Sequence, residues 1–270
     1  MENKAQTAAI KLPWQGTADE VAANIATGSL RESLLVWLKT ERGVHAETLL
    51  ASIGALAGFA AQTVALARVA KQDIPLPPGA AAPLSPDALG EHLRKSGLLV
   101  GASTKSGETF YFGDLINGYL VQQAVGEYPL WGFVAAAAIE GGAKAAELPD
   151  CSAMFRRAAQ TAGTPEFGAL QVVRQHQPQI TPRQALDLFW PRAKSILTRT
   201  DGPGPAKGQS VPVRYWATIH GIVARQLIVM TKNTLDPRVG FALVMESAIM
   251  MSKVDPATVP QDIPAKPPSQ

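Results

Sequence analysis

The feature that most constrains the fold is an uncharged run over residues 49–67, LLASIGALAGFAAQTVALA, in which small side chains recur at helical spacing. A helix without a polar face must be buried on most of its sides. Gly54 and Gly58 lie one turn apart in this run, although glycine inside a helix costs about 1 kcal/mol relative to alanine. The two glycines therefore predict that the backbone of a neighbouring helix approaches this one closely.

A membrane span is the alternative interpretation, because uncharged runs of this length can cross a bilayer. Most of the residues in the run are alanine, glycine and serine, which gain little in hydrocarbon. Arg42 precedes the run and Arg68 follows it, so the flanks show no positive-inside bias. We therefore expect a core helix of a soluble protein over residues 44–71 and do not expect membrane association.

Helix-start signals recur along the rest of the chain. Asp150 and Asp236-Pro237 each precede an apolar periodic segment, and Thr181-Pro182-Arg183-Gln184 reads as a capping box with proline at the first helical position. A first helix is expected over residues 18–40, with an inward face made of Val21, Ile25, Leu30, Leu34, Trp37 and Leu38.

One β-hairpin is predicted at about residues 97–113. Two strand-length runs flank the short turn Lys105-Ser106-Gly107. An isolated two-stranded hairpin is marginal in water, so this one must pack on helices or join the edge of a partner. The expected class is mainly α: a multi-helix, bundle-like fold around a buried Ala/Gly-rich central helix, with one inserted hairpin.

Length and proline content bound the domain organisation. A chain of 270 residues can form one large domain, and we expect a single domain over residues 1–270. Residues 1–17 read as an N-terminal arm, 73–86 as a Pro-rich loop and possible domain boundary, and 256–270 as a Pro-rich C-terminal tail.

Composition narrows the function classes. Charged residues make up only 17% of the chain, below the roughly 25% of typical soluble domains, and a weakly charged surface favours self-association. The net charge of +3 comes from scattered basic residues, so nucleic-acid binding is not expected. Cys151 is the one cysteine and the N-terminus lacks the apolar segment of a secretory signal, which together favour a bacterial-type cytoplasm.

Known catalytic, cofactor-binding and zinc-binding motifs are missing from the sequence. It contains no dinucleotide-binding glycine fingerprint, no nucleophile elbow and no His–Glu pair at zinc-binding spacing. We therefore expect neither a cofactor nor a metal ion. Cys151 is best explained as a small buried apolar residue.

Three residues of the last two helices are weak catalytic candidates. His220 falls on an apolar stripe of the helix that ends near residue 233, and Glu246 shares a helix face with methionines. A buried carboxylate must be paired or protonated, and the short connection at 232–235 makes Arg225 or His220 its expected partner. A structural ion pair, a solvent-facing Glu246 and a catalytic Glu246 are all compatible with the sequence.

The other histidines give weaker signals. His45 and Glu47 stand two residues apart, a spacing that points side chains to different faces of a helix, so no local pair is expected. His92 reads as part of a solvated face and His176 as part of a polar loop.

These observations favour a non-enzymatic function: an interaction, scaffolding or oligomerising protein. The expected partners are a second copy of the chain or another protein. The alternative is a small-ligand-binding protein or an enzyme with a pocket between the last two helices, built from His220, Arg225 and Glu246. Whether the protein is an enzyme is left open by the sequence.

Overall fold

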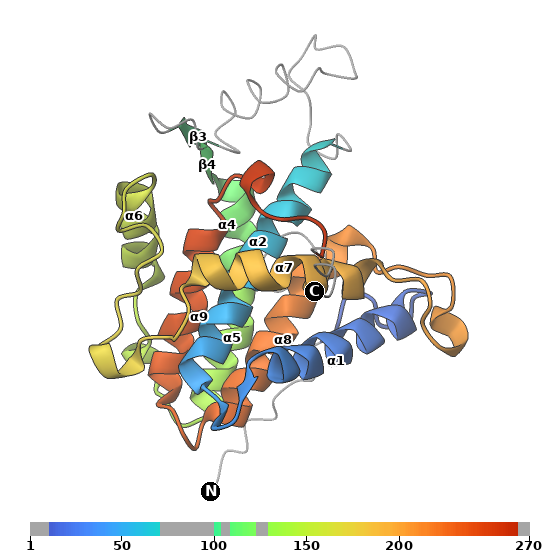
Figure 1. Cartoon of the computed structure of the whole chain (residues 1–270), viewed down its shortest axis with the longest axis horizontal. Coiled ribbons are helices and arrows are strands. Elements are labelled where there is room, and N and C mark those ends of the chain that lie inside the picture. The colour runs from blue at the N-terminus through green and yellow to red at the C-terminus, as the bar shows by residue number, and fades with distance from the viewer. Residues whose placement is uncertain (1–10, 71–99, 104–108, 123–128, 264–270) are drawn as a thin grey trace, which may run out of the picture.

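The computed structural model describes residues 11–70, 100–103, 109–122 and 129–263. Within these ranges the chain is mainly α-helical with a small antiparallel hairpin, which confirms the expected class (Figure 1). The α-helices are α1 (Glu20–Trp37), α2 (Ala46–Ala70), α4 (Asp114–Leu120), α5 (Leu130–Glu140), α6 (Cys151–Thr161), α7 (Pro182–Thr198), α8 (Trp216–Thr231) and α9 (Pro237–Met251).

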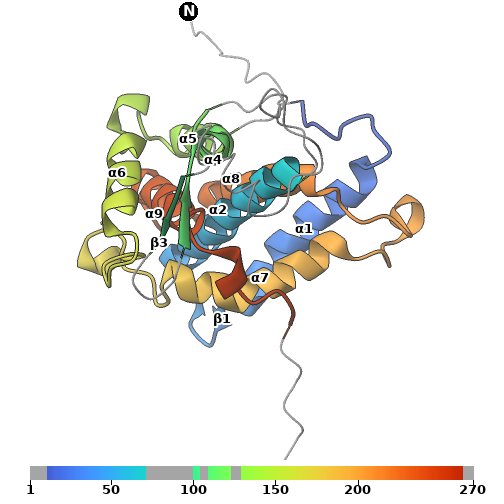
Figure 2. The same cartoon turned by 90° about the horizontal axis from the view of Figure 1, so that it is seen from above.

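Helix α2 lies at the centre of the fold, between α7, α8 and α9 (Figure 2). Residues Ala46–Arg68 are long and apolar enough to cross a bilayer, but 89% of the most apolar window is buried inside the protein. A Cβ atom on Gly54 would overlap the backbone of Val244, and one on Gly58 would overlap that of Ala248. The expectation that these glycines allow close helix packing is confirmed, and the neighbour is α9.

The remaining helices cover this centre. Helix α1 packs on α8 and α7, α5 packs on α8 and α9, and α6 lies against the outer side of α9 (Figures 1 and 2). One hydrophobic core runs through the described helices, from Trp14 to Val259. In α1, Leu30 and Leu34 are fully buried as expected, whereas Val21 is 38% exposed, so its assignment to the inward face is wrong. The buried face of the first turn is formed by Ala22 and Ala23, and Val21 lies beside it.

The predicted hairpin is present. Strand β3 (Val100–Ser103) pairs antiparallel with β4 (Thr109–Phe112). Its turn at 104–108 lies outside the described residues, as do the loop at 73–86 and His92. The hairpin packs on the helices, because the Tyr111 amide donates to the Lys253 carbonyl at the end of α9. A second, two-residue pair, β1 (Lys39–Thr40) and β2 (Gly43–Val44), joins α1 to α2 and was not expected from the sequence.

Helix starts follow the sequence signals. Thr181 and Gln184 form the capping box of α7, and Asp150 and Asp236 accept hydrogen bonds from the first-turn amides of α6 and α9. Short 3₁₀ segments connect the helices: η1 (Ala145–Glu147), η2 (Arg174–His176), η3 (Gly204–Ala206) and η4 (Val213–Tyr215). A further one, η5 (Pro256–Thr258), follows α9.

The N-terminal arm and the Pro-rich C-terminal tail are both partly packed on the core. Trp14, in the expected N-terminal arm, is 1% exposed and donates its indole N–H to Asn24 at 3.0 Å. In the C-terminal tail, Val259 is buried, and the Gln261 side-chain oxygen lies 3.4 Å from the indole nitrogen of Trp190 on α7. The described residues of both ends therefore lie against the helices.

Candidate functional site

Helices α1 and α8 pack against each other and cross (Figure 1). An open groove lies between them. Its volume is about 680 Å³, and the C-terminal end of α5 forms part of its wall. The lining residues are Arg31, Glu32, Leu35, Glu140, Ile222, Arg225, Gln226, Val229 and Met230.

The apolar residues of the groove come from both helices. Leu35, Ile222 and Val229 are half-buried, and Met230 is 49% exposed. On α8 the lining residues fall at i, i+3, i+4, i+7 and i+8 from Ile222, which is the spacing of one helix face. This face of α8 therefore points away from α2 and α9 and toward the groove.

Charged residues of both signs surround these apolar side chains. Arg31 pairs with Glu32 at 2.6 Å and lies 3.4 Å from the Gln226 side-chain oxygen. Arg225 lies 3.5 Å from Glu140 of α5. The side chains of both ion pairs are partly solvent-exposed, so each pair contributes little stability and can exchange its partner.

His220, the first of the three candidates, is fully buried beneath α7. Its Nδ1–H donates to the Trp216 carbonyl at 2.7 Å, and its ring stacks on Trp190 with 6.3 Å between centroids. Burial lowers the pKa of the imidazole to about 4, against the opposing effect of the hydrogen bond to Trp216. Nε2 has no hydrogen-bond partner among the described residues. His220 is therefore a neutral core residue at neutral pH.

Glu246 is buried in an ion pair, but its partner is not the expected one. Its carboxylate accepts from Arg157 of α6 at 2.6 Å and from the Gln171 amide at 2.7 Å. Burial raises the pKa of the Glu246 carboxyl, and the Gln171 amide and the Arg157 charge only partly oppose it. The expected pairing with Arg225 or His220 is wrong, because α6 packs against α9 and brings Arg157 to the carboxylate.

The three candidates thus lie in three different environments. His220 faces Trp190 and Glu246 faces Arg157, whereas Arg225 lines the groove beside Glu140. The cavities found among the described residues do not join them. The polar pocket expected between the last two helices is not formed by these side chains.

The structure instead brings together two histidines and a carboxylate that the sequence analysis kept apart. The Glu47 carboxylate lies 3.3 Å from His45 Nε2 and accepts from His176 Nδ1 at 3.0 Å. His45 is outside α2, immediately before its first residue, so the rule for side chains two apart in a helix does not apply to it. No local sequence signal marks His176, which reaches Glu47 only through the path of the segment between α6 and α7.

Hydrogen bonds fix the geometry of this cluster. His45 Nδ1 accepts from the Thr48 amide at 3.3 Å, and the Thr48 hydroxyl accepts from the Gln179 amide at 2.8 Å. Burial raises the pKa of Glu47, but the His176 hydrogen bond and the charges of both histidines outweigh burial and hold this pKa below its ordinary value. These contacts hold residues 176–179 against the first turn of α2.

The hydroxyl bonded to this cluster is that of Thr48, which lies 2.9 Å from His45 Nδ1. This places a hydroxyl beside a base, as nucleophilic catalysis requires, but Thr48 is 3% exposed, so its hydroxyl is not accessible to a substrate. Among the described residues no three His, Cys, Asp or Glu side chains are placed to hold a metal ion. Cys151 is buried, and burial together with the Asp150 charge raises its thiol pKa to about 12, so it is not a reactive thiolate.

Lys253 is a buried cation that the sequence analysis did not single out. It is 1% exposed at the end of α9, with Nζ 3.4 Å from the Asn117 side-chain oxygen and 5.5 Å from the centre of the Phe155 ring. Burial lowers its pKa to about 8. The helical spacing that aligns Lys253 with Glu246 in the sequence was the available signal, although α9 ends at Met251.

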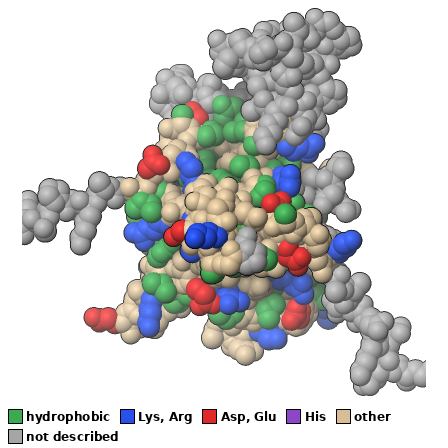
Figure 3. Space-filling model, turned by 90° about the vertical axis from the view of Figure 1, so that its right-hand side faces the viewer, with side chains coloured by type: hydrophobic (Ala, Val, Ile, Leu, Met, Phe, Trp, Pro, Cys, Tyr) green, Lys and Arg blue, Asp and Glu red, His purple; other side chains and the backbone are tan. Residues whose placement is uncertain are grey.

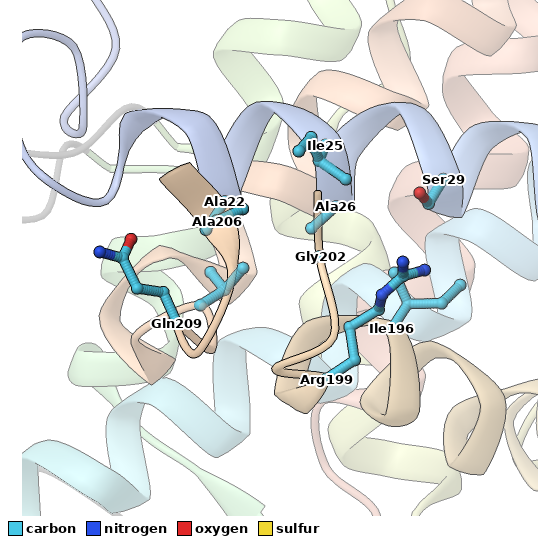
Figure 4. A pocket seen from close by; sticks show the side chains of 10 residues that line it. Ala22, Ile25, Ala26, Ser29, Ile196, Arg199, Gly202, Ala206 and Gln209 are labelled. Atoms are coloured by element: carbon cyan, nitrogen blue, oxygen red, sulfur yellow. The ribbon is translucent and has the colours of Figure 1, made fainter. Parts of the chain in front are cut away.

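A second cavity between α1 and the segment after α7 is too small for an organic ligand. Side chains including Ile25, Ser29, Arg199 and Gln209 surround it (Figure 4), and its volume is about 10 Å³. That is about the space of one water molecule. Of the surfaces described, the α1/α8 groove offers the most room.

The face shown in Figure 3 carries lysine, arginine and acidic side chains interspersed, without a large region of one sign. A nucleic-acid footprint would show a basic stripe or patch. Comparisons with known proteins add no assignment: no protein-family model, curated protein sequence or solved structure matches this chain.

Proposed function

We propose that this protein acts by binding another polypeptide, and that the groove between α1 and α8 receives a helix of that partner. The observation that carries the proposal is a groove of about 680 Å³ lined by half-buried apolar side chains and bordered by exposed ion pairs. Grooves of this kind bind the apolar face of an amphipathic helix.

The pattern on α8 supports a helical partner. Ile222, Val229 and Met230 belong to a stripe with helical spacing that lines the groove and is only partly buried. A third helix packed along α1 and α8 would remove this stripe from solvent, as α7, α8 and α9 remove α2 from solvent. Methionine suits such a surface, because its flexible side chain adapts to different contacts.

An enzymatic or small-ligand function built on His220, Arg225 and Glu246 has less support. Each of these side chains has its own partner, and they do not line a common cavity in the described part of the chain. A location in a bacterial-type cytoplasm stays a prediction of the sequence.

Site-specific photo-crosslinking in cells that naturally contain the protein tests the proposal. A photo-reactive phenylalanine derivative replaces Met230 in the full chain, and the matched control replaces Leu188, which is 55% exposed on α7 and outside the groove. We expect a protein adduct from position 230 and none from position 188. Absence of an adduct at 230, or equal adducts at both positions, would contradict the proposed function.

A further inference from the structure

We propose that the occupant of the α1/α8 groove is a second copy of this chain, docked about a two-fold axis so that the same face is used by both copies. This inference rests on the proposed function and gives it a partner. It follows from the charges of the face and from the exposed apolar side chains on it.

The charges of the groove sum to zero and both signs are present. Arg31 and Arg225 supply the cations and Glu32 and Glu140 the anions. A two-fold interface brings a surface against itself, so a face of one sign would repel its copy, whereas this one offers each copy an anion for every cation. A strongly acidic or basic partner would gain no such match.

The ion pairs are free to rearrange on docking. Arg31 and Glu32 are adjacent in sequence, and their side chains are 39% and 64% exposed. Arg225 and Glu140 are 31% and 48% exposed and are 3.5 Å apart. Because these pairs are weak and hydrated in one copy, exchanging them for pairs between copies costs little.

Exposed apolar side chains lie on and around the same face, and contact between two copies would remove them from water. Met230 is 49% exposed in the groove itself, and Val36 is 69% exposed one turn after Glu32 on α1. Ile139, next to Glu140, is 47% exposed. Three of the eight exposed large hydrophobic side chains in the described residues thus lie in the groove or beside residues that line it.

Sedimentation velocity of the full chain provides the first test. At tens of micromolar we expect a species of twice the 28.5 kDa chain mass. Met230→Glu should weaken the dimer by about tenfold or more, because it places an unpaired charge in the apolar contact. Leu188→Glu, the matched control on α7, should leave the mass unchanged. A monomeric wild-type chain, or a dimer insensitive to Met230→Glu, overturns the inference.

Charge reversal separates a second copy from any other partner. An acidic variant carries Arg31→Glu and Arg225→Glu, and a basic variant carries Glu32→Arg and Glu140→Arg. Each variant alone should be monomeric, since its groove repels its copy, and an equal mixture should form a heterodimer. Failure of the mixture to associate overturns the inference even if one variant is less stable, because circular dichroism reports separately whether each is folded.

The outcomes distinguish this inference from the proposed function. A photo-crosslink from position 230 to a protein of another mass, together with a monomeric purified chain, would leave the proposed function standing and remove the second copy. No crosslink at position 230 would remove both.

Discussion

At the scale of single residues, the burial of His220 makes the stability of the fold depend on pH. Its pKa is lowered to about 4 by burial, while an unfolded histidine titrates near pH 6.5. Between these values the unfolded chain binds a proton that the folded protein does not. The contribution of this residue to stability is therefore present above pH 6.5 and is lost as the pH falls toward 4.

Replacing His220 should remove this dependence. From pH 7.5 to pH 5 we expect the wild-type free energy of unfolding to fall by about 2 kcal/mol more than that of His220→Leu. Urea unfolding at the two pH values measures the difference, and the comparison is independent of any constant cost of the substitution. Equal pH dependence of the two proteins would show that His220 is not excluded from solvent.

Other single residues gained their partners only through the fold. Glu246 is paired with Arg157 from a helix far away in sequence, and removal of either partner would leave a buried group without its counterion. Glu47 pairs with His45, which is two residues before it, and with His176 of the segment between α6 and α7. Residue type indicated that a buried carboxylate needs a partner, but not which one.

At the scale of elements, the contact between α2 and α9 depends on two glycines. A side chain at Gly54 or Gly58 would overlap the α9 backbone, which a helix cannot move without losing its other contacts. By contrast, Gly28 in α1 has no atom within 4 Å of an added Cβ. The same substitution should therefore have opposite effects in the two helices.

We expect Gly58→Ala to destabilise the protein by about 1–3 kcal/mol or more, because the overpacked helices must separate. Gly28→Ala should stabilise it by up to about 1 kcal/mol, the helix propensity gained by alanine. Thermal or chemical denaturation of the two variants beside the wild type measures both effects. A tolerated alanine at 58 would mean that α2 and α9 are not in backbone contact.

At the scale of the whole molecule, the fold is organised around α2, which α7, α8 and α9 enclose. Helix α6, on the outer side of α9, has few buried residues: only Cys151 and Ala158. Elements with few buried contacts open at lower free energy than the core. We therefore expect α6 to unfold locally at a lower free energy than α2.

Hydrogen exchange measured by mass spectrometry checks this order. The amides of residues 49–67 should exchange only when the whole protein unfolds, and those of α6 should exchange faster under the same conditions. Partial denaturation in urea should release α6 before α2. Rapid exchange across α2, or exchange as fast as that of α6, would contradict a central position for this helix.

The sequence by itself determined the class of the fold, the central helix, its close approach to a neighbour at Gly54 and Gly58, and the starts of α6, α7 and α9 at Asp150, Thr181 and Asp236. These features depend on interactions within a few residues or on the absence of any polar face. Only the tertiary structure decided that Arg157 pairs with Glu246, that His176 reaches Glu47, and that Arg225 lies in a groove. Those contacts depend on how distant helices pack, and helix packing is set by the summed fit of many side chains, which no local pattern encodes.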